Sequence, residues 1–220
     1  MTPHHLHATA AALSLGAARG ALAARVRAER RQRGEALTAA GPISSPRYGT
    51  RRVVGGHADP VSATLVLDRT PARETTWAEV LRRSESRLAW IAQEMRAPDP
   101  HRPALPRIIA GIPNLRPANA RLIHLHLTGE LDWLGGLPLG WTPVRHPLGS
   151  VPCPHCEERQ LVVQADGPEH AWTVVCATRR LCTGTGCGCG MPGAVEGVAH
   201  IWWRADVIGA VAGAAPTHTE

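Results

Sequence analysis

All six cysteines of this 220-residue chain lie between residues 153 and 189, and this clustering constrains the fold more than any other feature. The first two, Cys153 and Cys156, form a C-x-x-C pair in the stretch VPCPHC. Two thiolates at this spacing can approach one metal ion at about 2.3 Å each. Where thiols stay reduced, closely spaced cysteines are more often ligands or catalysts than disulfides. The pair therefore predicts a metal-binding module.

The residues after this pair read as a hairpin. RQLVV and AWTVV are β-prone runs on either side of the turn QADGPEH, so the second strand would return Cys176 to the C-x-x-C pair. A glycine-rich loop then carries the other three cysteines, and GVAHIWW can supply a third strand. This order is typical of a zinc ribbon, in which four thiolates hold a structural Zn(II) ion. The predicted ligands are Cys153, Cys156, Cys176 and Cys187, with Cys182 and Cys189 as alternates. Because six cysteines exceed four, a second site stays open.

Other uses of the cysteines fit less well. A redox C-x-x-C normally opens a helix after a strand, whereas this pair precedes a strand-like run. A zinc deaminase also carries P-C-x-x-C, but it needs an H-x-E upstream of that stretch, and none precedes Pro152 in this chain. All 24 basic residues are arginine, so a Walker A loop, a Schiff-base lysine and a kinase lysine are excluded.

Helical patterns dominate the chain before the cysteines. Residues 6–40 are rich in Ala and Leu and favour helix. A T-x-x-E capping box at Thr76 begins an amphipathic pattern of about five turns. The segment 116–136 predicts another helix, on which only His126 and Glu130, four residues apart, could share a metal ion.

The positive charge is concentrated in residues 1–56. That segment has nine arginines against Glu29 and Glu35, which is +7, so the rest of the chain accounts for −1 of the net +6. The densest stretch, RVRAERRQR, would point arginines in every direction from a helix, so it is solvated or bound to an anion. The candidate nucleic-acid-binding residues are Arg25, Arg27, Arg30, Arg31, Arg33, Arg51 and Arg52.

The predicted fold class is α+β, with a mainly helical first part and a small three-stranded zinc ribbon after it. Proline, serine and glycine around residues 41–56 are typical of a linker, which divides the chain into a basic helical arm and linker (1–56), a helical domain (57–148) and the zinc ribbon (149–220). No stretch has the length and apolarity of a membrane span or the pattern of a signal peptide. We therefore expect a cytoplasmic protein.

The second half of the chain resembles a known group of sequences. RLIHLHLTGELDWLGG, then VRHPLGSVPCPHC, a strand pair, a cysteine-rich loop and GVAHIWW look like uncharacterised proteins encoded by phages and mobile elements of high-GC Gram-positive bacteria. The resemblance covers about residues 75 to 205 and implies a helical domain followed by a zinc ribbon, with no assigned chemistry. Cys153 and Cys156 match its first knuckle and Cys176 the start of its second, but Arg179 stands where the next cysteine would be.

These features predict a non-enzymatic nucleic-acid-binding accessory protein with structural zinc and an arginine arm that contacts phosphates. The first alternative is a structural or assembly protein, such as a virion or connector component, whose basic helix docks on a protein partner. The second is a zinc-dependent enzyme, which would need an open metal position and a nearby acid or base. No small-molecule substrate is evident from the sequence.

Overall fold

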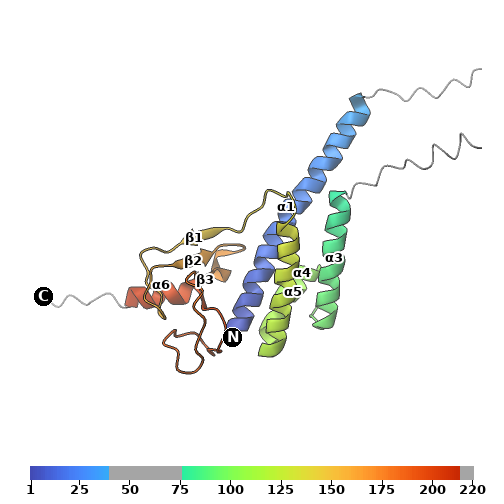
Figure 1. Cartoon of the computed structure of the whole chain (residues 1–220). Helices are drawn as coiled ribbons and strands as arrows, with labels where there is room; N and C mark the ends of the chain where they lie inside the picture. Colours follow the sequence, from blue (N-terminus) through green and yellow to red (C-terminus); the bar gives the residue numbers. More distant parts are fainter. Residues whose placement is uncertain (40–75, 214–220) are drawn as a thin grey trace, which may run out of the picture.

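A computed structural model describes residues 1–39 and 76–213 of the chain. A helical part comes first, and a small antiparallel sheet with its cysteine-bearing loops lies beside it (Figure 1). The helices are α1 (Pro3–Ala39), α3 (Trp77–Glu94), α4 (Ala104–Gly111), α5 (Pro117–Gly135) and α6 (Arg204–Gly213), with 3-10 turns at Ile112–Asn114 and Glu169–Ala171. The strands are β1 (Arg145–Pro147), β2 (Leu161–Gln164), β3 (Thr173–Cys176) and β4 (Ile201–Trp203). The α+β class is therefore confirmed.

The sheet has four strands in the order β1-β2-β3-β4, and every neighbouring pair is antiparallel. The predicted ribbon was one strand short, because β1 precedes residue 149 and pairs His146 with Val163. Proline at position 147 is compatible with this strand, since β1 is an edge strand and proline lacks a backbone donor. The sheet therefore begins inside the segment that was assigned to the helical domain.

Helix α1 is the centre of the helical part, although the sequence interpretation placed it with the linker in a separate arm. After Ala12, the side chains of α1 that belong to the helical core recur every three or four residues, at Leu15, Ala18 and Leu22, and α1 packs against α3, α4 and α5. Alanine on this stripe lets the neighbouring helices approach closely, while leucine fills the spaces between them. Only the later part of α1 is exposed and resembles an arm (Figure 1). The predicted linker and residues 57–75 lie outside the described residues.

The beginning of α1 also packs against the sheet. Leu6 and Ala10 belong to the same apolar cluster as the buried residues of β2, β3 and β4. The His7 ring Nε2 lies 2.9 Å from the carbonyl oxygen of Ala199, and the Ser14 hydroxyl donates to Asp166 at 2.5 Å. One helix therefore holds the helical part and the sheet together.

The two predicted helices after residue 75 are confirmed. The capping box is present in full, since the Thr76 hydroxyl accepts from the Glu79 backbone and the Glu79 carboxylate accepts from the Thr76 backbone. The α5 stripe that faces the core ends at Leu134 and contains one charged residue, Glu130. Within the described ranges, no helix has both the length and the apolarity needed to cross a membrane.

Candidate metal centres

The structure gathers the six cysteines into two separate clusters. The sulfur atoms of Cys182, Cys187 and Cys189 and a ring nitrogen of His200 lie within 4.8 Å of one another. The sulfur atoms of Cys153, Cys156 and Cys176 form the second group within the same limit. We refer to these as the four-ligand cluster and the three-cysteine cluster. Soft thiolates together with imidazole are the ligands that zinc prefers in structural sites.

The distances inside both clusters match a tetrahedral zinc site. Two sulfurs that each lie 2.3 Å from the same tetrahedral ion are about 3.8 Å apart. The Cys182 and Cys189 sulfurs are 4.0 Å apart, and Cys156 and Cys176 are 3.7 Å apart. The Cys187 sulfur is 3.4 Å from Nε2 of His200. Both clusters are therefore consistent with structural zinc.

His200 is held in the orientation that a metal ligand needs. Its Nδ1 lies 3.0 Å from the carbonyl oxygen of Arg180, so Nδ1 carries the proton and Nε2 is left with its lone pair toward the cysteines. The ring is fully buried and stacks on His155 at 4.2 Å and on Trp202 at 5.8 Å. The imidazole is thus fixed in both tautomer and position before any ion binds.

The glycine-rich loop places its three cysteines around His200. Gly184 has a φ of +86°, a conformation that favours glycine, and its carbonyl accepts from the Cys187 backbone to close a tight turn. A Cβ at this position would lie 3.4 Å from the Glu196 side chain, so the turn is crowded as well. The Trp202 indole donates to the Cys189 carbonyl at 2.9 Å and ties the loop to β4.

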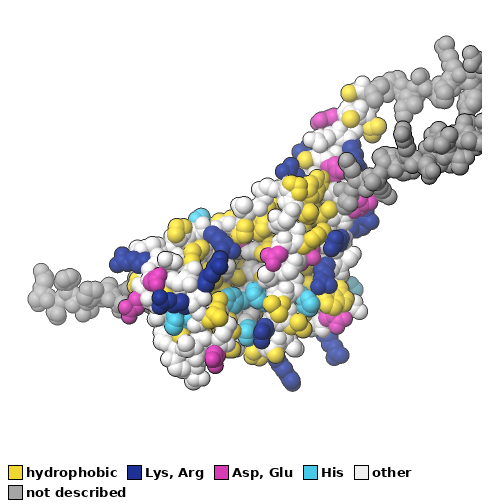
Figure 2. Space-filling model, viewed as in Figure 1, with side chains coloured by type: hydrophobic (Ala, Val, Ile, Leu, Met, Phe, Trp, Pro, Cys, Tyr) yellow, Lys and Arg dark blue, Asp and Glu magenta, His cyan; other side chains and the backbone are white. Residues whose placement is uncertain are grey.

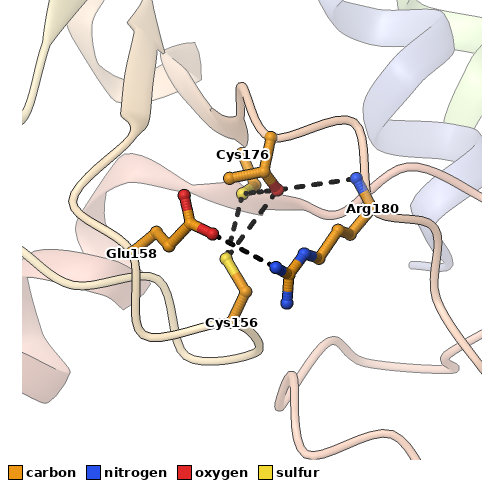
Figure 3. Close-up of polar contacts among 5 residues, drawn as sticks. Cys156, Glu158, Cys176 and Arg180 are labelled. Carbon is orange, nitrogen blue, oxygen red and sulfur yellow. Dashed lines mark hydrogen bonds and ion pairs between the residues drawn. The ribbon is translucent and has the colours of Figure 1, made fainter.

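The three-cysteine cluster lies between the first knuckle and the end of the β2–β3 hairpin. The Cys153 backbone accepts from Glu157, which has a φ of +60°, and the strand register pairs Leu161 with Cys176. As Figure 3 shows, Cys156 and Cys176 point toward each other from the two segments. The β2–β3 hairpin brings Cys176 back to the C-x-x-C pair, as predicted.

A fourth protein ligand is missing from this cluster within the part of the chain that the structure describes. Arg179 stands where the second cysteine of a C-x-x-C motif beginning at Cys176 would be. The Thr178 hydroxyl lies 3.0 Å from the Cys176 sulfur. Arg180 pairs with Glu158 at 3.2 Å and links the two segments next to Cys156 and Cys176 (Figure 3). A tetrahedral ion held here would keep one position for a hydroxyl, water or another small ligand.

The thiol pKa values differ within each cluster. Burial raises the pKa of Cys153 to about 12 and that of Cys189 to about 11. Burial also acts to raise the pKa of Cys187, but hydrogen bonds from the Thr183 backbone and from His200 outweigh it and lower the pKa to about 5. Hydrogen bonds lower the pKa of Cys156 in the same way. Each cluster thus pairs an easily ionised thiol with a buried one that needs a bound cation to stay ionised.

The predicted ligand set is divided between the two clusters. Cys153, Cys156 and Cys176 are brought together, whereas Cys187 lies with both alternates around His200. The spacing of the cysteines could not separate these groups, because one of the four ligands in the second group is a histidine. His200 lies immediately before β4 and follows the Cys187-x-Cys189 pair in the sequence. This order was the sequence feature that could have identified it as a ligand. His155 of the first knuckle also reaches Cys187, at 3.2 Å, so the two clusters are neighbours.

The predicted phosphate-binding arginines fall into four groups. The Arg25 side chain turns back toward the body and its Nε donates to the Leu139 carbonyl at 3.4 Å. Arg33 pairs with Glu29 at 2.7 Å on the exposed end of α1. The remaining members on α1 are exposed and make no ion pair with any residue of 1–39 or 76–213, and they are Arg27, Arg30 and Arg31. Arg51 and Arg52 lie outside the described residues.

The comparisons with known proteins identify no relative of this chain. No protein-family model, no curated protein and no solved structure matches it. The functional conclusion therefore rests on the residues themselves.

Proposed function

We propose that the protein is a non-enzymatic nucleic-acid-binding accessory protein whose sheet module is stabilised by zinc. The observation that carries this proposal is the placement of three arginines on the projecting end of α1. Arg27, Arg30 and Arg31 are spaced i, i+3 and i+4, so they share one face of the helix, and all three are exposed. Figure 2 shows charged side chains along the part of α1 that extends beyond the packed body.

This face suits phosphates because its charge is available. Helices that lie along nucleic acid commonly neutralise phosphates with arginine, and each contact releases counterions. The guanidinium group can donate two parallel hydrogen bonds to one phosphate. The packed start of α1 fixes the projecting end to the zinc-stabilised body, so the body would orient the arginines. An accessory role of this kind suits a phage or mobile element, the setting that the sequence resemblance implies.

The test is a fluorescence-anisotropy titration of labelled single-stranded and duplex oligonucleotides at several salt concentrations. The variant replaces Arg27, Arg30 and Arg31 with Gln, and the matched control replaces the exposed residues Arg102, Arg116 and Arg159, which removes the same charge elsewhere. Deletion of residues 1–56 is unsuitable, because it would remove the central helix. The plot of log K against log salt has a negative slope. We expect this slope to become shallower by about 2 on single strands in the first variant alone. Equal slopes in the two variants would refute the phosphate-binding role of Arg27, Arg30 and Arg31.

Two other functions each have one supporting observation. Leu37, on the projecting end of α1, is 71% exposed, which suits a helix that docks on a protein partner in an assembly. Co-purification of that partner, unchanged by nuclease, would favour this reading. The three-cysteine cluster leaves one position on a tetrahedral ion, as a zinc enzyme requires. A zinc-dependent reaction lost on Cys156→Ser would favour that one.

A further inference from the structure

A groove between α3 and α5 holds a second set of groups that suits a nucleic acid. Its volume is about 710 Å³. Figure 2 shows histidine, arginine and apolar side chains close together over these two helices. Its lining residues on α3 include Arg83, Arg87 and Trp90, and those on α5 include His126, Glu130 and Trp133.

Glu130 is the residue that points to a ligand. It lies on the core-facing stripe of α5 between Leu127 and Leu134 and is only 9% exposed. Its Oε1 is buried and has no hydrogen-bond partner among the residues that the structure describes. A buried carboxylate oxygen without a donor is costly, and such groups are rare without a functional reason. A ligand that brings N–H donors into the groove would satisfy it.

The charges of the groove favour an anion that carries such donors. The Arg83 guanidinium lies 4.2 Å from the Trp133 ring and the Arg87 guanidinium 4.7 Å from the Trp90 ring. Both guanidinium groups line the same groove as the Glu130 side chain. A cationic ligand for Glu130 would be repelled by both arginines, whereas a phosphate would be attracted. The same two pairs present flat surfaces on which a base can stack.

We propose that this groove binds a guanine base of a single-stranded nucleic acid, with Glu130 accepting from the base, the tryptophan–arginine pairs stacking on it and the arginines attracting the flanking phosphates. This inference rests on the proposed nucleic-acid-binding function and adds the strand type and the base. It concerns a surface separate from the projecting end of α1.

Guanine is the base that matches an ionised carboxylate. A carboxylate only accepts hydrogen bonds and has two oxygens side by side. Guanine offers two adjacent donors, N1–H and the N2 amino group, on its Watson–Crick edge. Adenine and cytosine place an acceptor nitrogen beside their amino group, and uracil and thymine flank a single N–H with carbonyl oxygens, so each would bring a lone pair toward Glu130. A base in a duplex has this edge occupied, which is why the ligand must be single-stranded.

The test uses the zinc-loaded full chain and two labelled single strands of equal length, one of thymidine alone and one with guanines at its centre. We expect the guanine strand to bind about 5- to 150-fold more tightly, the range for a good bidentate contact to a base. Glu130→Gln should remove this preference, because an amide offers one acceptor and one donor. Trp90→Ala should weaken both strands about 5- to 150-fold through lost stacking.

Two controls separate binding from folding. Trp172→Ala removes a tryptophan that also faces an arginine, Arg204 at 5.2 Å, but that lies on the sheet module, so it should leave both affinities unchanged. Urea denaturation of Glu130→Gln should show stability equal to or above that of the native chain, because the Glu130 Oε1 atom has no hydrogen bond to lose among the described residues. Strand binding without a guanine preference, or a preference that survives Glu130→Gln, would overturn this inference and leave the proposed function standing. If neither single strand binds, this inference is overturned, and if the duplex of the earlier titration does not bind either, the proposed function is overturned as well.

Discussion

The four-ligand cluster makes a sharp prediction about two stacked histidines. His200 and His155 both place a ring nitrogen near the Cys187 sulfur, at 3.4 and 3.2 Å. Only His200 is grouped with all three cysteines, is fully buried and has its second nitrogen fixed by a backbone carbonyl. We therefore expect two zinc ions per chain in the native protein and in His155→Ala, but one in His200→Ala.

The expected size of the effect follows from the roles of the two rings. Loss of a residue that only orients a ligand lowers metal affinity by about 10- to 100-fold. Loss of a ligand itself should have a larger effect. His200→Ala should therefore weaken zinc binding at the four-ligand cluster by more than about 100-fold, or roughly 2.7 kcal/mol of zinc-linked stability at a fixed zinc concentration. His155 only contacts and orients ligands, so His155→Ala should stay within about 10- to 100-fold.

The assay is metal content by mass spectrometry after dialysis against a competing chelator, followed by zinc titration of each stripped protein. Circular dichroism of the zinc-loaded variants checks that the helices persist, since α1, α3 and α5 do not contain either histidine. If His155→Ala loses an ion and His200→Ala keeps two, the ligand assignment is wrong. If the native chain never exceeds one ion, the division into two clusters is wrong.

Three further predictions concern stability. Leu15→Ala, at a fully buried position of α1, should lower the free energy of unfolding by about 2–5 kcal/mol in urea denaturation, whereas Leu37→Ala on the exposed end should change it by less than about 0.5 kcal/mol. Thr76→Ala should cost about 1 kcal/mol in the same assay through loss of the α3 cap, and an unchanged midpoint would contradict the capping role. Burial lowers the pKa of His7 to about 4, against the opposing effect of its bond to Ala199, so protonation favours the unfolded chain as the pH falls from about 6.5 toward 4. Stability measured at pH 7.5 and 5.5 should therefore fall less in His7→Gln than in the native chain, by about 1 kcal/mol, and an equal fall would refute the buried neutral state.

The elements predicted from sequence were those whose signals are local. Spacing and a capping box are local properties, so the helix after Thr76 and the return of Cys176 to its knuckle could be foreseen. The role of α1 could not, because an alanine-rich stripe has little contrast with its exposed face and does not identify its partners. The partners of α1 include β4, whose Trp202 joins the same apolar cluster as Leu6.

The candidate sites show the same division. Cysteine spacing located the metal-binding module but not the grouping within it, since His200 reaches Cys187 only after β4 pairs with β3. The three residues of the short strand β1 are all exposed and one of them is a proline, so the strand has no alternating pattern that would reveal it. The groove at Glu130 depends on how α3 and α5 pack, and its unpaired oxygen cannot be seen from residue types.

The position of α1 has a consequence for how the chain folds during synthesis. The helix is synthesised before the segments that it contacts, since it reaches Leu115 through His5, Asp166 through Ser14 and Ala199 through His7. Until those later segments have been made, its apolar stripe has no native surface to cover it. Alanine suits this interval, because it gives a high helix propensity while exposing little apolar area to aggregation or to chaperones. The core of the helical part can close once α5 has been made, whereas the core of the sheet closes only when β4 and His200 arrive, and these long-range contacts should make folding slow for a chain so rich in helix.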